Sequence, residues 1–495
     1  MFDAYAAIST PPGQSGLAVI RVAGPDAHTI GDRVFRFGTM NIGNVNEINS
    51  GTVDRAIRSV QNLAGYQAAF GYVVDPDTEE PIDEAVLLCF RAPHSFTGED
   101  TVEISVHGGG QVRRRTLAAC LQAGARSAEP GEFTKNAFLN GKLDLAQAEA
   151  VMELIEADTS RSAAVALHQL QGGLSKAVRS ILDVLYSIMS ELELTIEYPE
   201  YEDSELDFPS IKRRVDQAKS ELEILRSGYR QGRILRHGMT VALVGPPNAG
   251  KSSLLNRLSG EERSIVTDVP GTTRDTIELD IELDGIPVRL IDTAGLRESM
   301  DPIERLGVKR TKDTIKQADL IVGMVAPETE TIDDTRLWLE ALPQDKPFIW
   351  VANKSDRKEF ADYFQQLKAD LLPHLHFSDA QMICHDILGE TYPPLVISTR
   401  KAGSLNLLKK YIVALYDAWG SPSEEGVILT SERHYDALVK ASNQLEFIAE
   451  DIDGLPLDIF AQSLKSVAEQ LALIIGDKVT DAVIDEVFSR FCVGK

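Results

Sequence analysis

The sequence is poor in cysteine. Its 495 residues include four cysteines, and no two of them are separated by only two residues, as they are in redox and zinc motifs. Close pairs are also lacking, so we expect no structural disulfides and a reducing compartment. Cys89, in AVLLCF, and Cys120, in LAACL, lie within apolar runs and are predicted to be buried thiols.

Long hydrophobic runs are absent as well. No stretch reaches the roughly 18 consecutive apolar residues that a membrane-spanning helix needs. The start, MFDAYAAISTPPG, has an Asp and no basic segment of the kind that opens a secretory signal. We therefore expect a cytoplasmic protein without a membrane partner.

Positive charge is scarce. Lys and Arg number 50 against 75 Asp and Glu, which gives a formal net charge of -25. A field of this sign repels nucleic acids and anionic membranes. Short basic clusters at 113–115, 212–214 and 309–312 have no interleaved aromatic residues, which base stacking would require. Any contact with RNA is therefore expected to be local or to be supplied by a partner.

The chain is too long for a single hydrophobic core, and its pattern changes along its length. Residues 1–131 predict an α+β domain, because strand patterns at GLAVIRVAG, AAFGYVV, EAVLLCFRA and TVEISVHGG accompany one helical pattern at QVRRRTLAACLQAG. Residues 132–236 and 419–495 have helical periodicity, whereas residues 237–418 alternate between strand and helix patterns. We therefore predict a multidomain fold in which an α/β domain is inserted into a discontinuous all-α domain.

Helical periodicity is clear on both sides of the α/β domain. Apolar residues recur three or four apart from Leu167 to Ile196, which predicts one long amphipathic helix. After the acidic linker EYPEYEDSELDFP, a second helix is predicted from residue 211 to about residue 236. Two further helical faces are predicted at 435–452 and 464–475.

The segment GPPNAGKS, residues 245–252, has the spacing G-x-x-x-x-G-K-[ST] directly after an apolar strand and before a helical pattern. In this motif the glycines let the main chain approach phosphate groups, and main-chain N–H groups and Lys251 meet their charge. The Ser252 hydroxyl can ligate Mg²⁺. The residues predicted to contact the nucleotide here are Asn248, Ala249, Gly250, Lys251, Ser252 and Ser253.

Further motifs follow in the order typical of a guanine-nucleotide domain. DTAG (Asp292, Thr293, Ala294, Gly295) can contact the coordination shell of the metal and the γ-phosphate. GTTRD at 271–275 can reach Mg²⁺ through a threonine. In NKSD, which contains Asn353, Lys354 and Asp356, the final carboxylate can accept from both N1–H and N2–H₂ of guanine. Adenine lacks that donor pair, so GTP is predicted. A weaker motif, ISTRKAG, offers Ser398, Thr399 and Arg400 to the base.

One absence in this region is informative. The residue after DTAG is Leu296, whereas small signalling GTPases have there a Gln that orients the attacking water. Another group must therefore organise hydrolysis. The acidic candidates are Glu298, Asp301 and Glu304.

With these motifs in place, the sequence resembles the MnmE family of tRNA modification GTPases, also known as TrmE. The segments that carry the resemblance are TPPGQSGLAVIRVAG, SFTGEDTVEISVHGG, PGEFTKNAFLNGKLDLAQAEAV, GPPNAGKSSLLN, TDVPGTTRD, DTAGLRES and the terminal FCVGK. A P-loop alone indicates only a superfamily, whereas this set in this order spans nearly the whole chain.

The resemblance implies a homodimer whose folate-binding-like α+β domains bind a one-carbon carrier, 5,10-methylenetetrahydrofolate or its analogue 5-formyltetrahydrofolate. It implies an inserted GTPase domain that dimerises when GTP and K⁺ are bound. It also implies a flavin-dependent partner, MnmG, with which the family builds an aminomethyl or carboxymethylaminomethyl group on C5 of the wobble uridine of certain tRNAs.

The resemblance also assigns roles to particular residues of this sequence. The folate contacts would be Arg21, Glu99, Lys142 and Lys495. K⁺ would be held by Asn248, Thr267, Val269 and Thr272, and Mg²⁺ by Ser252 and Thr273. A loop that contacts GTP would comprise Thr267, Asp268, Val269, Pro270, Gly271, Thr272 and Thr273. Catalysis would involve Glu304, which would orient water through a bridging water, together with Lys251 and Cys492.

The terminal FCVGK follows a helical segment with an apolar face formed by Val483, Val487, Phe488 and Phe491. Docking of this face would hold Cys492 and Lys495 in a fixed place. A thiolate near a one-carbon unit could act as a nucleophile or as an acid or base. A structural thiol is the alternative.

Two other functions remain open. A ribosome-assembly GTPase that binds RNA would share the nucleotide motifs but not the folate-like domain or the terminal Cys. A non-catalytic scaffold would use GTP only to open and close a dimer. The sequence also departs from the family in the length of segment 357–396 and in Ser-Thr-Arg, where Ser-Ala-Arg or Ser-Ala-Lys is more usual.

Overall fold

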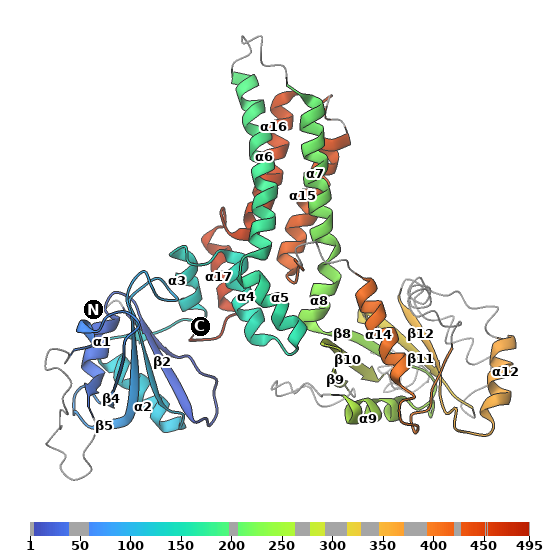
Figure 1. Ribbon diagram of the computed structural model, residues 1–495, viewed down its shortest axis with the longest axis horizontal. Helices are drawn as coiled ribbons and strands as arrows, with labels where there is room; N and C mark the ends of the chain where they lie inside the picture. The colour runs from blue at the N-terminus through green and yellow to red at the C-terminus, as the bar shows by residue number, and fades with distance from the viewer. Residues whose placement is uncertain are drawn as a thin grey trace, which may run out of the picture. The chain divides into compact units, whose positions relative to one another are not determined.

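The computed structural model describes residues 4–38, 59–197, 206–262, 278–292, 314–327, 346–370, 394–419, 427–450, 452 and 454–494. The chain divides into two compact units, one formed by Met1–Met152 with Ile475–Lys495 and the other by Glu153–Ile474. Figure 1 shows the elements of each unit. The domain boundaries predicted after residues 131, 236 and 418 stay predictions. None of the helices in the described ranges has the length and hydropathy that crossing a bilayer requires.

Within its described residues, the first unit is built on a seven-stranded sheet with strand order β3-β4-β5-β6-β2-β1-β7. The strands are β1 Tyr5–Ile8, β2 Leu17–Ala23, β3 Phe35–Phe37, β4 Ala68–Val74, β5 Pro81–Phe90, β6 Thr101–His107 and β7 Arg126–Ser127. Adjacent strands in this part are antiparallel, except that β1 and β7 are parallel. The four predicted strands correspond to β2, β4, β5 and β6, so that prediction is confirmed.

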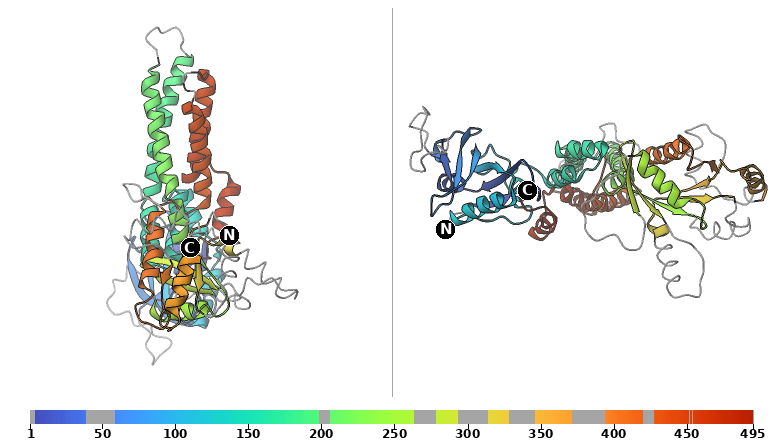
Figure 2. Two further views of the ribbon diagram at one scale, coloured as in Figure 1. Left: turned by 90° about the vertical axis from the view of Figure 1, so that its right-hand side faces the viewer. Right: turned by 90° about the horizontal axis from the view of Figure 1, so that it is seen from below.

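Two helices, α1 Ala27–Val34 and α2 Gly110–Gln122, pack on one face of this sheet, as Figure 2 shows. Alternate side chains of β5, such as Leu87 and Cys89, are fully buried beneath them, and so is Cys120 of α2. Both thiols are therefore buried as predicted. Val86, between two buried neighbours on β5, is 42% exposed on the other face.

The end of the chain folds back into the first unit. The elements involved are α3 Glu132–Leu139, α4 Leu145–Glu156 and α17 Asp481–Ser489. Phe488 and Phe491 are buried in a cluster with Leu145, and α17 packs against α3. Beyond the helix, Val493 pairs with Pro130 in an isolated β-bridge. The prediction that the terminal helix docks through an apolar face is confirmed.

The second unit contains the long helices. Its helical part comprises α5 Ser160–Leu170, α6 Gly173–Glu197, α7 Phe208–Ser227, α8 Tyr229–His237, α15 Glu432–Glu450 and α16 Leu457–Ile475. Figures 1 and 2 show α6, α7, α15 and α16 side by side, and Nζ of Lys219 on α7 lies 2.9 Å from Oε1 of Glu446 on α15. Because α6 and α7 precede the α/β part and α15 and α16 follow it, the helical domain is discontinuous, as predicted.

Two predicted helices were wrong in their extent. The pattern from Leu167 to Ile196 predicted one helix, but the chain forms α5 and α6 with a break at Gly172. That glycine has a φ of 86°, a left-handed conformation that ends helices. The next predicted helix is divided into α7 and α8 at Gly228, since glycine is a poor helix former. Ile196 was expected on the buried face but is 42% exposed.

The α/β part of the second unit has a six-stranded sheet in its described residues, with strand order β13-β12-β11-β8-β10-β9. Its elements are β8 Met239–Val244, α9 Lys251–Glu261, β9 Glu278–Leu283, β10 Ile286–Asp292, β11 Leu320–Val325, β12 Phe348–Ala352, α12 Phe360–Asp370, β13 Leu395–Val396 and α14 Asn406–Ala418. Apart from antiparallel β9, these strands are parallel. The carboxyl ends of β8, β10, β12 and β13 therefore meet at one edge, where ligands of such sheets bind.

Candidate functional site

The loop between β8 and α9 approaches other main-chain and side-chain atoms so closely that only glycine fits at two positions. Gly245 has a φ of 151°, and a Cβ there would lie 2.2 Å from the carbonyl oxygen of Met324. Gly250, which has a φ of 104° and precedes the first turn of α9, would place a Cβ 2.2 Å from Nδ2 of Asn353. The loop therefore brings main-chain N–H groups to the start of α9, the arrangement that binds phosphate.

Lys251 is held within this loop. Its side chain is buried, and Nζ donates hydrogen bonds to the carbonyl oxygens of Gly245 at 2.7 Å and Pro246 at 3.1 Å. The ammonium group therefore lies beside the carbonyls of the loop, where its charge can meet a polyphosphate.

Ser252 and Asp292 are joined at the ends of two neighbouring elements. The Ser252 hydroxyl, in the first turn of α9, donates to Oδ2 of Asp292 at the end of β10 over 3.0 Å. The other carboxylate oxygen of Asp292, Oδ1, is buried and has no hydrogen-bond partner among the described residues. Hydroxyl and carboxylate oxygens are the ligands that Mg²⁺ prefers, so this pair fits that ion.

The NKSD motif and the ISTRKAG segment meet at the same edge. Asn353 is buried, its Nδ2 donates to the carbonyl oxygen of Ala249 at 2.9 Å, and its Oδ1 accepts from the Thr399 N–H at 3.3 Å. The Ser398 hydroxyl donates to Oδ1 of Asp356 at 2.7 Å, and this bond is the main cause that lowers the pKa of Asp356. The Asp356 carboxylate, the predicted acceptor for guanine, is thus held ionised. Arg400 follows in the same loop, and its N–H donates to Ser398.

Several predicted contacts fall outside the described residues and stay predictions. They are Thr267, Asp268, Val269, Pro270, Gly271, Thr272, Thr273, Thr293, Ala294, Gly295, Glu298, Asp301, Glu304 and Lys495. Of the predicted nucleotide contacts, the residues that the structure brings together are Asn248–Ser253 of the P-loop, Asp292, the NKSD motif and Ser398–Arg400.

A second group of predicted residues lies in the first unit. The Arg21 guanidinium lies 5.4 Å from the ring centre of Phe133 and 5.7 Å from that of Phe96, and Nε donates to Oε1 of Glu103 at 2.8 Å. Lys142 donates from Nζ to the carbonyl oxygen of Pro93 at 3.1 Å. Arg21 and Lys142 therefore both contact the loop that connects β5 and β6.

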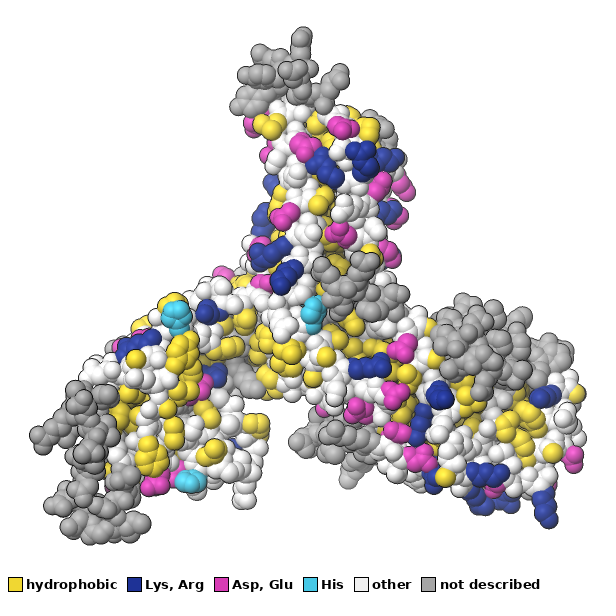
Figure 3. Space-filling view, in the orientation of Figure 1, with side chains coloured by type: hydrophobic (Ala, Val, Ile, Leu, Met, Phe, Trp, Pro, Cys, Tyr) yellow, Lys and Arg dark blue, Asp and Glu magenta, His cyan; other side chains and the backbone are white. Residues whose placement is uncertain are grey.

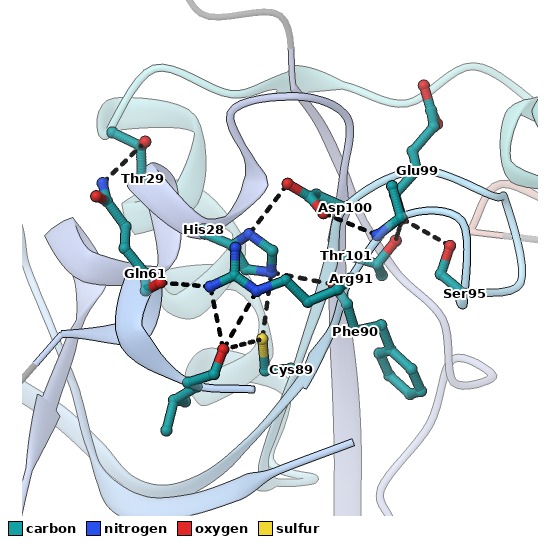
Figure 4. A network of polar contacts seen from close by, with 12 residues as sticks. His28, Thr29, Gln61, Cys89, Phe90, Arg91, Ser95, Glu99, Asp100 and Thr101 are labelled. Atoms are coloured by element: carbon teal, nitrogen blue, oxygen red, sulfur yellow. Dashed lines mark hydrogen bonds and ion pairs between the residues drawn. The ribbon is translucent and has the colours of Figure 1, made fainter. Parts of the chain in front are cut away.

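Glu99 belongs to the same loop. Its Oε2 accepts from the Tyr5 hydroxyl at 2.6 Å, and the ring centre of Tyr5 lies 4.8 Å from that of Phe133, which Arg21 also contacts. Figure 4 shows the Glu99 side chain pointing away from His28, whose Nδ1 lies 3.3 Å from Oδ2 of the next residue, Asp100. Arg21, Glu99 and Lys142, predicted together, are thus grouped around one loop of one domain.

Comparisons with known proteins cover the whole chain. The family models described as GTP-binding protein TrmE N-terminus and MnmE helical domain match residues 4–142 and 145–492. A tRNA modification GTPase MnmE from Natranaerobius thermophilus is 38% identical over 494 residues, which cover 100% of this chain and 99% of the relative. Its counterparts from Geobacillus thermodenitrificans and Bacillus licheniformis are 38% and 37% identical, and the match covers 100% of this chain with each and 99% and 100% of these relatives. The chain belongs to the MnmE family of tRNA modification GTPases.

Among solved structures, a crystal structure of an Aquifex aeolicus Era variant bound to GDP.AlF4- is 26% identical to this MnmE-family chain. The match covers 41% of the chain and 66% of that structure, with a TM-score of 0.27. A TM-score this low supports no statement about the chain as a whole.

The tail of this MnmE-family chain is held through its main chain. The carbonyl oxygen of Cys492 accepts from the Gly131 N–H at 3.3 Å, and a Cβ at Gly494 would lie 2.4 Å from the carbonyl oxygen of Ile8. The Cys492 side chain itself is exposed. The thiol is therefore accessible in the described chain, and both its chemical role and its structural alternative stay predictions.

Two residues that contact Glu99 were missed by the sequence analysis. Tyr5 lies in the run YAAI and has the pattern of an ordinary buried strand residue, and Asn136 lies in the helical segment EFTKNAFL. Neither belongs to a motif with a local chemical signature, and only the pairing of distant elements brings them to Glu99.

Proposed function

We propose that this chain is a GTP-hydrolysing enzyme of tRNA modification that works with a flavin-dependent partner, MnmG. Together they add an aminomethyl or carboxymethylaminomethyl group to C5 of the wobble uridine of certain tRNAs, in the cytoplasm, with a tetrahydrofolate one-carbon unit. The observation that carries the GTP-dependent part is the meeting of Asn353, Asp356 and Ser398 beside the P-loop. The full-length similarity to MnmE proteins supports the tRNA-directed part.

In the nucleotide site, each residue has a role that follows from its chemistry. Asp356 accepts from guanine, and Lys251 and the amides of the P-loop bind the phosphates. Ser252 would hold Mg²⁺, with Asp292 acting on the shell around the metal, and the ion would neutralise negative charge on the phosphates. Thr273 completes this set. These residues bind and orient the nucleotide, and a separate group has to orient the water.

K⁺ and Glu304 complete hydrolysis in this proposal. Asn248 has a φ of 66° at the tip of the P-loop, and its amide oxygen is a suitable ligand for a monovalent cation. Thr267, Val269 and Thr272 supply the remaining oxygen atoms, and the G domains dimerise when the cation and GTP are bound. Positive charge there serves the purpose that an arginine finger serves in other GTPases, and Glu304 orients the attacking water.

The folate binds in the first unit. Arg21 and Lys142 provide positive charge for the carboxylates of 5,10-methylenetetrahydrofolate or 5-formyltetrahydrofolate, Glu99 accepts from its N–H groups, and Lys495 adds a further cation. Cys492, whose side chain is exposed at the end of the docked tail, is the candidate for chemistry at the one-carbon unit. The grouping of the first three residues around one loop supports this part of the proposal.

The open face of the first sheet supports a homodimer in this proposal. Phe70 and Val86 are paired across β4 and β5, are 49% and 42% exposed, and lie on the face that α1 and α2 do not cover. Leu17 on β2 and Tyr66 are more exposed still. Apolar side chains grouped in this way on a sheet face favour burial against another surface. Sedimentation of the full chain is expected to give about twice its mass of 54.3 kDa.

The charge distribution favours tRNA contacts that are local or shared with MnmG. Figure 3 shows Lys and Arg side chains interspersed with Asp and Glu along the long helices, rather than gathered in one basic area of the visible face. A net charge of -25 makes non-specific RNA binding weak.

The deciding experiment is nucleoside analysis of tRNA from cells that lack this protein. The modified wobble uridine should disappear, and the wild-type chain should restore it. Unchanged wobble uridine together with accumulated immature ribosomal subunits would favour the ribosome-assembly alternative. Restoration by a variant that binds GTP without hydrolysing it would favour a scaffold.

A further inference from the structure

The main chain of Glu99 is held by three hydrogen bonds within its own loop. Its main-chain N–H donates to the Thr97 hydroxyl at 3.2 Å, and its carbonyl oxygen accepts from Ser95 at 2.6 Å and Thr101 at 3.2 Å. Figure 4 shows the contacts with Ser95 and Thr101 at the end of the loop. Position and direction of the side chain are therefore set before any ligand binds.

The Glu99 carboxylate is oriented by two residues from other elements. Oε2 accepts from the Tyr5 hydroxyl on β1 at 2.6 Å and from Nδ2 of Asn136 on α3 at 3.3 Å. The same Asn136 amide donates to the Tyr5 hydroxyl oxygen at 2.7 Å. The three side chains form a closed triangle in which Oε2 is occupied. Oε1 has no hydrogen-bond partner in the described part of the chain.

Tyr5 is a rigid donor. It is 3% exposed, its ring packs on Phe133, and the Arg126 guanidinium lies 5.2 Å from its ring centre. Burial, and then the hydrogen bond to Glu99, raise the pKa of Tyr5 far above its usual value. The hydroxyl therefore keeps its proton and donates a hydrogen bond to the carboxylate.

We propose that Tyr5 and Asn136 are positioning residues that fix Oε2 of Glu99 and so aim Oε1 at the N–H donors of the ligand. This inference rests on the proposed folate function. In a folate the adjacent N–H donors that one carboxylate oxygen can meet belong to the pterin ring, whereas the glutamate end carries carboxylates that Glu99 would repel. The triangle thus directs the ring end of the folate to Glu99 and lowers the cost of ordering that side chain on binding.

The test is isothermal titration of the full chain with 5-formyltetrahydrofolate. Tyr5→Phe keeps the ring and its packing but removes the donor, and we expect Kd to rise about tenfold, the effect of one hydrogen bond to a charged group. Asn136→Ala should also weaken binding. Tyr72→Phe is the matched control, because Tyr72 is a 6% exposed tyrosine of the same sheet, outside the triangle. Its Kd should equal that of the wild type.

A positioning role and a purely structural role differ in two further measurements. Tyr5→Phe should reduce the rise in melting temperature caused by the ligand, while the ligand-free melting temperature falls no more than in Tyr72→Phe. The effects of Tyr5→Phe and Asn136→Ala should also be less than additive, since Asn136 reaches Glu99 both directly and through Tyr5.

The outcomes separate this inference from the function on which it rests. If the wild-type chain binds 5-formyltetrahydrofolate and Tyr5→Phe binds it equally well, only the positioning role is overturned. A loss of ligand-free stability that accounts for the whole change in Kd would also overturn it. If the wild-type chain does not bind 5-formyltetrahydrofolate, the folate function fails and the inference fails with it.

Discussion

The side-chain amide of Asn353 donates a hydrogen bond to the main-chain carbonyl oxygen of Ala249 at 2.9 Å. This bond joins the NKSD motif, which is proposed to bind the base, to the P-loop, which is proposed to bind the phosphates, although the two residues are far apart in the chain. Gly250 makes the contact possible, because a side chain there would collide with the same amide nitrogen. The two halves of the nucleotide site are therefore set by one buried side chain.

Asn353→Ala is expected to weaken GTP and GDP binding by about tenfold to a hundredfold, since it removes the support of the P-loop as well as a contact to the base. Fluorescence titration with a labelled nucleotide measures the change. Asn406→Ala, at the exposed start of α14, is the control and should bind normally. Equal affinity of Asn353→Ala and the wild type would contradict the proposed role of this bond.

GTP hydrolysis is expected to be several times faster in K⁺ than in Na⁺, because a cation at the P-loop can neutralise charge in the transition state. The measurement is turnover in the two chlorides at matched ionic strength. Asn248→Ala should lose the difference between the salts. Equal turnover of the wild-type chain in both salts would exclude a K⁺ site.

Glu304→Ala is expected to retain its affinity for GTP and to lose about a hundredfold in kcat, because a water-orienting group acts in the transition state rather than in the ground state. Single-turnover hydrolysis and nucleotide titration separate the two effects. Glu298→Ala serves as the control. Normal hydrolysis by Glu304→Ala would shift the assignment to Glu298 or Asp301.

Cys492→Ser is expected to abolish uridine modification and to leave GTP turnover largely intact. The thiol is exposed while neighbouring Phe491 anchors the tail, so the substitution should not disturb docking. GTP turnover and tRNA nucleoside content are measured for each variant, with Arg490→Ala as an exposed control on the same turn. Survival of modification would leave Lys495 as the remaining candidate, and a collapse of GTP turnover would indicate a role in folding.

The first unit is expected to lose stability as the pH falls below about 6.5, because of His28. Burial lowers the pKa of His28, against the attraction of Asp100, whose Oδ2 lies 3.3 Å from Nδ1. The unfolded state then binds more protons below about 6.5, so stability is fully present above that pH and is lost as the pH approaches the folded-state value. Calorimetry of the full chain between about pH 5 and pH 7.5 measures the slope.

His28→Gln should flatten this acid-side slope. His107 is the control with the opposite sign, because its hydrogen bond to Asp83 raises its pKa and its contribution is lost as the pH rises. His107→Gln should therefore leave the acid-side decline in place or steepen it. A slope that is unchanged in His28→Gln would show that other groups cause the acid sensitivity.

The local features of this protein could be predicted from the sequence. The glycine spacing in GPPNAGKS determines a turn before a helix, and alternation in segments such as EAVLLCF determines which strand residues are buried. These features depend on residues that are close together in the chain. One helix was predicted where the chain forms α5 and α6. The apolar spacing continues through Gly172, whose left-handed φ interrupts the helix.

The sequence by itself determined the nucleotide motifs, their order and the apolar face of the terminal helix, since each follows from short-range spacing and side-chain chemistry. Only the tertiary structure decided which of these groups touch: that Ser398 donates to Asp356, and that Tyr5 and Asn136 orient Glu99. Strand order and helix docking set such contacts between distant residues. A tyrosine in a buried strand has the same local pattern whether or not a carboxylate lies within reach of its hydroxyl.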